Sequence, residues 1–214
     1  MTQTEITQYV DHVEHSIGGL GGHAFRRLTH ISMSLIPLAY YLHGGTIAAF
    51  VSLNPREFVS AVCITILLIE VARLRLGIVI IGQREYESSQ ISALAWGALA
   101  VSLALLIAPE GDGGGLKSGM YGIPLIFGLT FVDPVMGEVK RKKKDMRAAI
   151  FAGLAVSYLV WIGCHFWLGT ELLVAILLAP LTVAGELPKT KFIDDNATMV
   201  LLPLSGLVLM MPFL

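Results

Sequence analysis

The chain has 214 residues, of which 55% are hydrophobic and only 14% are charged, and its mean hydropathy is +0.72. Soluble domains carry about 25% charged residues, so the composition excludes an ordinary soluble domain and predicts an integral membrane protein. The formal net charge of −1 does not point to a partner, because the charges are segregated along the chain, and we expect no nucleic-acid partner.

Apolar segments occupy most of the length and leave no room for a separate soluble domain. We expect a cytoplasmic leader over residues 1–25 and a single transmembrane helical domain over residues 26–214. The start of the chain has no positive segment followed by an apolar core, so no cleaved signal peptide is expected. Cys63 and Cys164 lie inside apolar runs and are interpreted as small core residues.

A helix that crosses a bilayer needs about 20 consecutive apolar residues. Seven segments fit this length or come close to it, which predicts an all-α, multi-pass membrane protein with seven spans, or with six as the alternative. The second segment carries charges, so we expect its span to end near Glu70, with an interfacial helix or re-entrant piece after it. The segments are Ile31–Leu53, Phe58–Ile81, Ile91–Ala108, Met120–Met136, Ala148–Leu168, Thr170–Leu187 and Ala197–Leu214.

The basic residues orient these spans, because Lys and Arg concentrate on the cytoplasmic side of membrane proteins. With seven spans, all 15 Lys and Arg except Arg56 and Lys117 fall on one side. Most acidic residues fall on the same side. We therefore predict a cytoplasmic N-terminus and an active site at the cytoplasmic boundary.

Two polar pairs lie near the starts and ends of the first spans. Arg26 and His30, four residues apart with Arg27 between them, share one face of a helix; they are either boundary anchors or functional groups. Glu70 and Arg73, three residues apart, form either an ion pair within a helix or a clamp for an anionic head group.

Other polar residues lie at later helix ends. Asp133 ends the fourth predicted span, where a carboxylate could hold a metal or take a proton from an alcohol. Lys140–Lys144 is a positive-inside signal, an anionic-lipid patch or an attractor of nucleotide phosphates. Burying charges such as Glu70, Asp133 and Glu186 at membrane depth costs free energy unless they are paired or face water. We therefore expect these helix ends to line one polar cleft.

The last loop, Lys191–Ala197, carries acidic and amide groups between two apolar segments. Oxygen-rich side chains of this kind are poor packing material and good ligands for a hydrated divalent cation. The loop therefore predicts a polar, metal-assisted site where lipid meets water.

Taken in order, these motifs form a pattern: Arg-Arg-x-x-His, Glu-x-x-Arg, Arg-Glu, Asp-x-x-x-Gly, and Glu followed by Ile-Asp-Asp-Asn. The pattern resembles the dolichol kinase, phytol kinase and yeast-type diacylglycerol kinase family, a distant relative of the phosphatidate cytidylyltransferases. The resemblance runs from Arg26 to the C-terminus. Its elements are Arg26, Arg27 and His30; Glu70 and Arg73; Arg84 and Glu85; Asp133 and Gly137; Glu186 and Ile193–Asn196.

The resemblance implies an all-helical membrane enzyme that moves the γ-phosphoryl group of CTP onto a membrane-embedded alcohol with the help of Mg²⁺ or another divalent cation. It implies that Asp194, Asp195 and Asn196 hold the cation and that Asp133, His30 and Glu186 are catalytic. The remaining implied positions are phosphate-binding Arg26, Arg27, Arg73, Arg84, Lys140, Lys143, Lys189 and Lys191, with Glu70, Glu85 and Gly137 elsewhere in the cleft.

One departure from the family bears on the phosphoryl donor. The family follows its Asp-x-x-x-Gly region with more glycines and a Lys-Thr/Ser-x-Glu-Gly-Ser element, whereas this chain has no glycine between Gly137 and Gly153. The expected function is thus transfer from CTP, or from another nucleoside triphosphate, to an isoprenoid alcohol or a diradylglycerol. The alternatives are a CTP-dependent nucleotidyltransferase that makes a CDP-lipid, and a non-catalytic lipid- or ion-binding membrane protein or transporter.

Overall fold

The computed structural model describes residues 17–83, 85–188, 190 and 193–214, and this part of the chain is helical without any strand. The predicted all-α fold class is confirmed. The α-helices are α2 (Gly19–Ser32), α3 (Leu35–Ala49), α4 (Pro55–Leu76), α5 (Ala93–Ile107), α6 (Gly122–Lys143), α7 (Met146–Leu168), α8 (Leu172–Glu186) and α9 (Asp195–Met210). The short 3₁₀ helices are η1 (Glu85–Ser88), η2 (Gly115–Gly119) and η3 (Met211–Phe213).

Three helical stretches are long and apolar enough to cross a membrane: α6 with 22 residues, α7 with 23, and Asp195–Phe213 with 19. Helices α5 and α8 are apolar but shorter, with 15 residues each. These lengths and compositions indicate a membrane protein. The seven-span count and the cytoplasmic N-terminus stay predictions.

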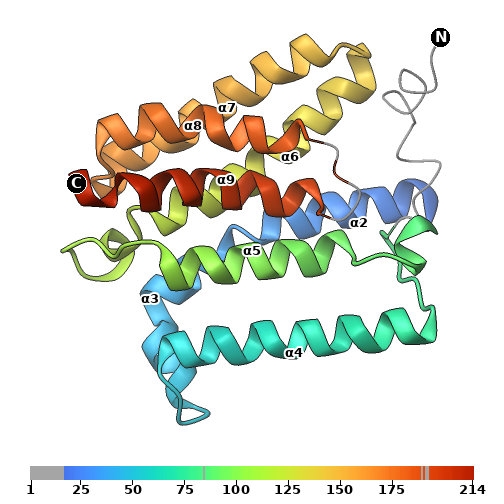
Figure 1. Ribbon diagram of the computed structural model, residues 1–214, viewed down its shortest axis with the longest axis horizontal. Helices are drawn as coiled ribbons and strands as arrows, with labels where there is room; N and C mark the ends of the chain where they lie inside the picture. Colours follow the sequence, from blue (N-terminus) through green and yellow to red (C-terminus); the bar gives the residue numbers. More distant parts are fainter. Residues whose placement is uncertain (1–16, 84, 189, 191–192) are drawn as a thin grey trace.

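The first predicted span, Ile31–Leu53, is not one helix. The chain breaks at Met33 and Ser34 between α2 and α3, because Pro37 has no N–H to donate to the Met33 carbonyl and its ring crowds that oxygen. The Ile36 N–H bonds to Met33 instead, at 3.1 Å. Helix α3 then leaves the direction of α2 and runs toward the start of α4 (Figure 1).

The second predicted span was expected to end near Glu70 and to give way to a separate interfacial helix or re-entrant piece, but the helix does not break there. Helix α4 starts at a capping box in which Asn54 and Glu57 satisfy each other's backbone N–H groups, and it continues to Leu76. It ends at Gly77, whose φ of +63° is a conformation that glycine adopts without strain. The charges do not break the helix, because Glu70 and Arg73 pair on one face of it.

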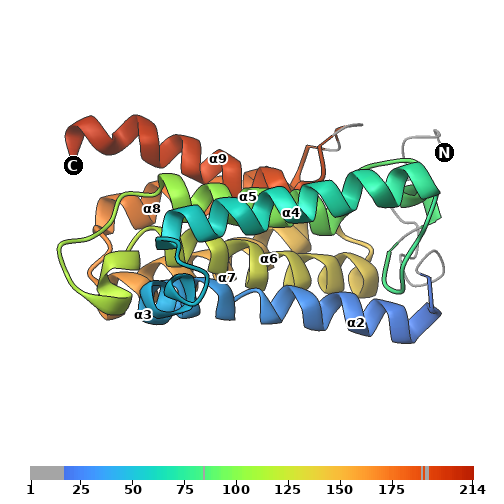
Figure 2. The same cartoon turned by 90° about the horizontal axis from the view of Figure 1, so that it is seen from below.

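Helices α5 to α9 enclose the main core, in which α6 packs on α7, α7 on α8, α8 on α9 and α9 on α5. The fully buried side chains include Trp161, Leu129, Leu178 and Met199. Helix α2 lies along α6, and α4 packs against α5 at the edge of the bundle (Figures 1 and 2).

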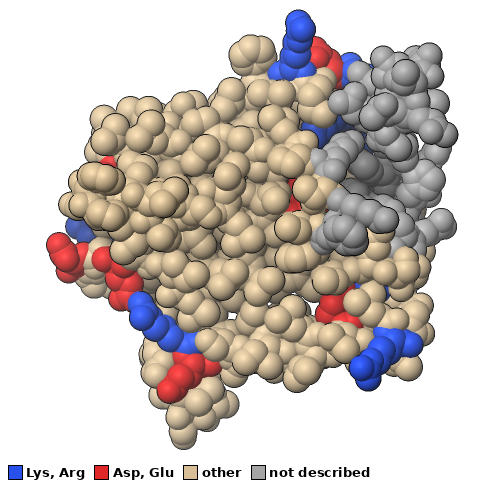
Figure 3. All heavy atoms as spheres, viewed as in Figure 1, with Lys and Arg blue, Asp and Glu red and all other residues tan. Residues whose placement is uncertain are grey.

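The polar helix ends gather at one end of the bundle, on the right in Figure 1. The C-terminal ends of α4, α6 and α8 and the N-terminal ends of α2, α5, α7 and α9 lie there. On the face seen in Figure 3, charged side chains lie toward the ends and margins, with a broad uncharged surface between them.

Candidate functional site

Helix α2 presents a polar face toward α6. His23, Arg26, Arg27 and His30 recur at the three-, four- and seven-residue spacing of one helix face, and all four line the same pocket. Burial of the His30 ring lowers its pKa below the usual value for histidine, and this effect outweighs the opposing charge of Asp133. His30 is therefore neutral at neutral pH.

Helix α6 supplies the opposite wall. Asp133, Gly137 and Lys140 follow one another at spacings of four and three residues, so they share a face of the helix. The Asp133 Oδ2 atom lies 3.4 Å from His30 Nδ1 and 3.6 Å from Arg27 Nη1. The carboxylate is thus held between a neutral imidazole and a guanidinium.

Gly137 lets the Arg27 guanidinium lie directly on α6. A Cβ atom at position 137 would be 2.4 Å from Arg27 Nη2, closer than real contacts allow. Arg27 also reaches the backbone carbonyl of Asp133, 3.5 Å from its Nη1. The glycine of the Asp-x-x-x-Gly motif therefore has a steric role in placing an arginine.

The two carboxylate oxygens of Glu186, the last residue of α8, differ in their contacts. Oε1 accepts a hydrogen bond from Lys140 Nζ, while the buried Oε2 has no hydrogen-bond partner among the residues that the structure describes. The side chain is only 5% exposed. The preceding Gly185 brings α8 against the backbone of α9, because a Cβ there would lie 2.5 Å from the Thr198 carbonyl oxygen. A buried polar atom without a partner is unusual in native proteins and marks a place for a ligand or a water.

The Asp194-Asp195-Asn196 motif divides into three different environments at the start of α9. Asp194 is the N-cap and accepts a hydrogen bond from the Asn196 N–H at 3.1 Å. Asp195 lines the pocket. Asn196 is buried, and its Nδ2 donates to the Ala93 carbonyl at 3.2 Å, which ties α9 to the start of α5.

The Asp194 carboxyl yields a prediction about pH. Burial and the adjacent Asp195 raise the pKa of Asp194 from 3.8 to about 7. Its ionisation therefore destabilises the fold fully above about pH 7, and this penalty fades as the pH falls toward 4. Asp194→Asn keeps an N-capping oxygen and removes the penalty. We expect its melting temperature, measured with a chelator present, to exceed that of the wild type near pH 8 and to match it near pH 4.

The control for this prediction is Asp145→Asn. Asp145 is an exposed N-cap on α7 that accepts a hydrogen bond from the Arg147 N–H at 2.8 Å. The same substitution there should leave the pH dependence of the melting temperature unchanged. A wild type that is more stable than Asp194→Asn in alkaline buffer would contradict the prediction.

The described residues bring ten side chains or glycines into one pocket at the polar end. Arginines and histidines come from α2, and carboxylates come from α6, α8 and α9. With Lys140 from α6, the lining carries three formal positive charges and three carboxylates. The lining residues are His23, Arg26, Arg27, His30, Gly82, Asp133, Gly137, Lys140, Glu186 and Asp195.

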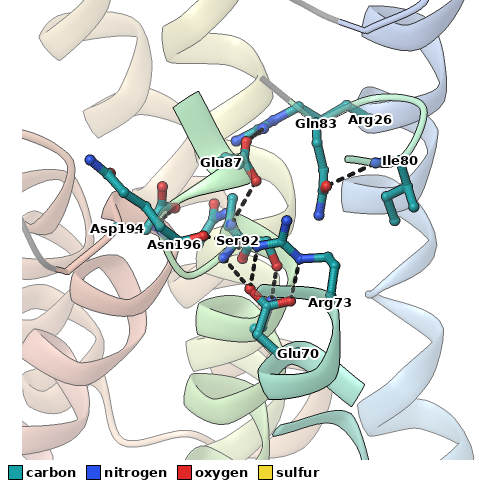
Figure 4. Close-up of polar contacts among 12 residues, drawn as sticks. Arg26, Glu70, Arg73, Ile80, Gln83, Glu87, Ser92, Asp194 and Asn196 are labelled. Carbon is teal, nitrogen blue, oxygen red and sulfur yellow. Dashed lines mark hydrogen bonds and ion pairs between the residues drawn. The ribbon is translucent and has the colours of Figure 1, made fainter. Parts of the chain in front are cut away.

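Glu70 and Arg73 lie outside this pocket, in a buried network that joins α4 to the start of α5 (Figure 4). Arg73 donates to both Glu70 oxygens, at 2.9 and 2.8 Å, and to the carbonyls of Ile78 and Gln90, at 2.8 and 2.9 Å. The Ser92 N–H donates to Glu70 at 2.6 Å. Of the two interpretations of this pair, the contacts match the ion pair within a helix.

Of the other expected phosphate-binding residues, only Lys143 falls within the described ranges, and it does not line this pocket. Lys143 is exposed in the last turn of α6. Arg84, Lys189 and Lys191 lie outside the described residues, as does the side chain of Glu85.

Three residues of the site were not predicted. His23 lines the pocket, and its spacing of three, four and seven residues from Arg26, Arg27 and His30 was the available signal. Gly82 enters from the loop after α4. Glu87, buried in η1, accepts hydrogen bonds from Arg26 Nη1 and from the Ala93 N–H, both at 3.2 Å. No local pattern distinguishes Glu87 from a solvated loop charge.

A divalent cation fits this site only as a partner of phosphates. Within the described ranges, no group of three or more His, Cys, Asp and Glu side chains is placed to hold a metal by itself. Mg²⁺ in nucleotide sites typically takes one or two carboxylates and fills its octahedron with phosphate oxygens and water. Asp195, with Asp133 across the pocket, offers such carboxylates beside arginines that suit the phosphates.

Comparison with protein-family models gives no match for this chain, and comparisons with curated proteins and with solved structures give none either.

Proposed function

We propose that this protein is a membrane lipid-alcohol kinase, which transfers a phosphoryl group from CTP or another nucleoside triphosphate to an isoprenoid alcohol or a diradylglycerol. One observation carries the proposal: residues from four helices far apart in the sequence converge in one pocket at the polar end of an apolar bundle. A pocket that holds both basic side chains and carboxylates suits a ligand that brings both phosphates and a cation.

Phosphoryl transfer requires different roles from the basic and the acidic residues of the pocket. The reaction requires positioning, neutralisation of the phosphate oxygens and a proton acceptor near the attacking hydroxyl. Arg26 and Arg27 neutralise phosphate oxygens from the α2 side. Asp195 binds the cation of the metal–nucleotide complex, and that cation, when bound, withdraws charge from the transferred group.

Glu186 is the proposed proton acceptor. Its free Oε2 is the one carboxylate oxygen of the pocket that the structure leaves without a hydrogen bond among the described residues and buried from solvent. Lys140, bound to the other oxygen, holds the carboxylate in place. The acceptor hydroxyl would donate its proton to Oε2 as its oxygen attacks the γ-phosphorus, and the nucleoside diphosphate would leave.

The test is phosphoryl transfer by the purified full-length chain in phosphatidylcholine nanodiscs with γ-labelled CTP or ATP, Mg²⁺ and a panel of lipid alcohols. The expected result is a labelled lipid monophosphate and release of nucleoside diphosphate. Release of pyrophosphate with a phosphorylated lipid acceptor would instead establish the nucleotidyltransferase alternative. If no donor and acceptor gave a labelled lipid or released pyrophosphate, both enzyme functions would be rejected and a non-catalytic protein favoured.

A further inference from the structure

A second hollow adjoins the polar pocket and is largely apolar, although Thr29, Gln83 and Glu87 also line it. Phe25 on α2 and Met33 just after this helix form one of its walls, Leu94 and Gly97 on α5 form the other, and Ile80 and Ile81 close it from the loop after α4. We call this hollow the α2–α5 groove. Phe25, Ile80, Ile81 and Leu94 are each about half exposed or more, so the groove is open at its rim.

The groove and the pocket are continuous. Arg26, His30 and Gly82 line both hollows, so one ligand can occupy the two at once. Such a ligand has a polar head that suits arginines and carboxylates and an apolar body that suits isoleucine, leucine and phenylalanine side chains. In a membrane protein, the molecules with this construction that are present in excess are lipids.

We propose that the α2–α5 groove binds the hydrocarbon chain of the lipid acceptor while the hydroxyl of the same lipid lies in the polar pocket. This inference rests on the proposed function for the identity of the head group. The groove sets the direction in which the acceptor enters: between α2 and α5, with the chain held over the first turn of α9, where Asn196 lies at the base of the groove.

Gly97 determines the free space in the groove. A Cβ at this position would lie 3.4 Å from the Met33 methyl carbon, in ordinary contact, so any larger side chain projects across the groove toward Met33. Gly97→Leu therefore fills the space that the chain would occupy. Leu94→Trp narrows the exposed rim instead and tests the same idea at a residue that packing constrains less.

The experiment uses photocrosslinking of the full-length protein in phosphatidylcholine nanodiscs, without nucleotide. The probes are a diacylglycerol and a polyprenol, each with a diazirine near the far end of one hydrocarbon chain, and labelled peptides are mapped by mass spectrometry. We expect one of the probes to label the segments that form the groove. In Gly97→Leu and Leu94→Trp this labelling should fall about tenfold, because a hydrocarbon chain forced into a groove that a larger side chain already fills loses roughly that factor in occupancy. Gly163→Leu is the control, because Gly163 is an exposed helical glycine on α7 with open space around it.

The outcomes separate the groove from the kinase. Label on the groove segments without any phosphoryl transfer would support a lipid-binding site in the groove and reject the proposed kinase activity. Phosphoryl transfer to a short-chain soluble alcohol that persists in Gly97→Leu, together with loss of long-chain transfer, supports the groove. Two results would overturn the inference. One is label spread evenly over outer surfaces such as that of α7. The other is label on the groove segments that persists in both groove variants while their melting temperature is unchanged.

Discussion

Asp195→Asn is expected to lower phosphoryl-transfer turnover by roughly 100-fold or more, the loss typical when one group that stabilises transition-state charge is removed. Asp195 lines the pocket across from the arginines of α2. An amide keeps the size of the side chain and removes the negative charge that a Mg²⁺–nucleotide complex requires. The measurement is turnover across a Mg²⁺ titration, in which the variant should need more Mg²⁺ to reach its half-maximal rate.

Glu138→Gln is the matched control for this experiment. Glu138 is a carboxylate on α6 that does not line the pocket, and it pairs with Arg141 and Lys142, at 2.7 and 3.2 Å. Its replacement should leave turnover and the Mg²⁺ requirement unchanged. If Asp195→Asn retained wild-type turnover and Mg²⁺ dependence, Asp195 would have no part in binding the cation.

Arg73→Ala is expected to destabilise the fold by about 3–5 kcal/mol, because it leaves the buried Glu70 carboxylate without its counter-ion. The Glu70 and Arg73 side chains are 9% and 7% exposed. The substitution also removes the donors to Ile78 and Gln90, which fix the loop that carries Gly82 and Glu87 to the site. Unfolding of the purified protein in mixed micelles, followed by tryptophan fluorescence, measures the loss.

A second ion pair at the other end of the bundle provides the control. Arg56 and Glu110 lie 3.4 Å apart, with side chains 61% and 51% exposed. Arg56→Ala should cost less than about 1 kcal/mol, because solvent screens such pairs. Equal effects of Arg56→Ala and Arg73→Ala would show that the buried network does not hold the fold together.

A double-mutant cycle isolates the Glu70–Arg73 interaction. Glu70→Ala with Arg73→Ala removes both buried charges, so the double variant should be less destabilised than the sum of the single variants. Additive losses would mean that each residue acts through its other contacts and not through the pair.

The sequence predicted part of the site because helical spacing is local. The recurrence of Arg26, Arg27 and His30 places them on one face of α2, whichever helix covers that face. The sequence did not predict that Arg73 would turn to Glu70, because a spacing of three residues suits a clamp and an internal pair equally well. Which of the two forms depends on the carbonyls of Ile78 and Gln90, and a loop brings these within reach.

Local pattern also failed at the end of one helix. The expected end of a span near Glu70 assumed that charges leave the apolar segment, whereas a partner one turn away lets α4 continue to Leu76. The break between α2 and α3 precedes Pro37 by one helical turn, as the missing N–H of proline requires. A proline indicates where a helix breaks but not how far the chain then turns.

Composition by itself determined that the chain is helical and suited to a membrane, because a segment poor in charge must satisfy its backbone polar groups internally in lipid. The order of the motifs determined which residues were candidates. Only the tertiary structure decided which of those candidates meet, because this depends on packing between helices that are distant in the chain. Examples are the pairing of Lys140 with Glu186, the separate environments of Asp194 and Asp195, and the groove between α2 and α5. Packing of that kind is set by side-chain shape, as at Gly137 and Gly185, and leaves no periodic signal in the sequence.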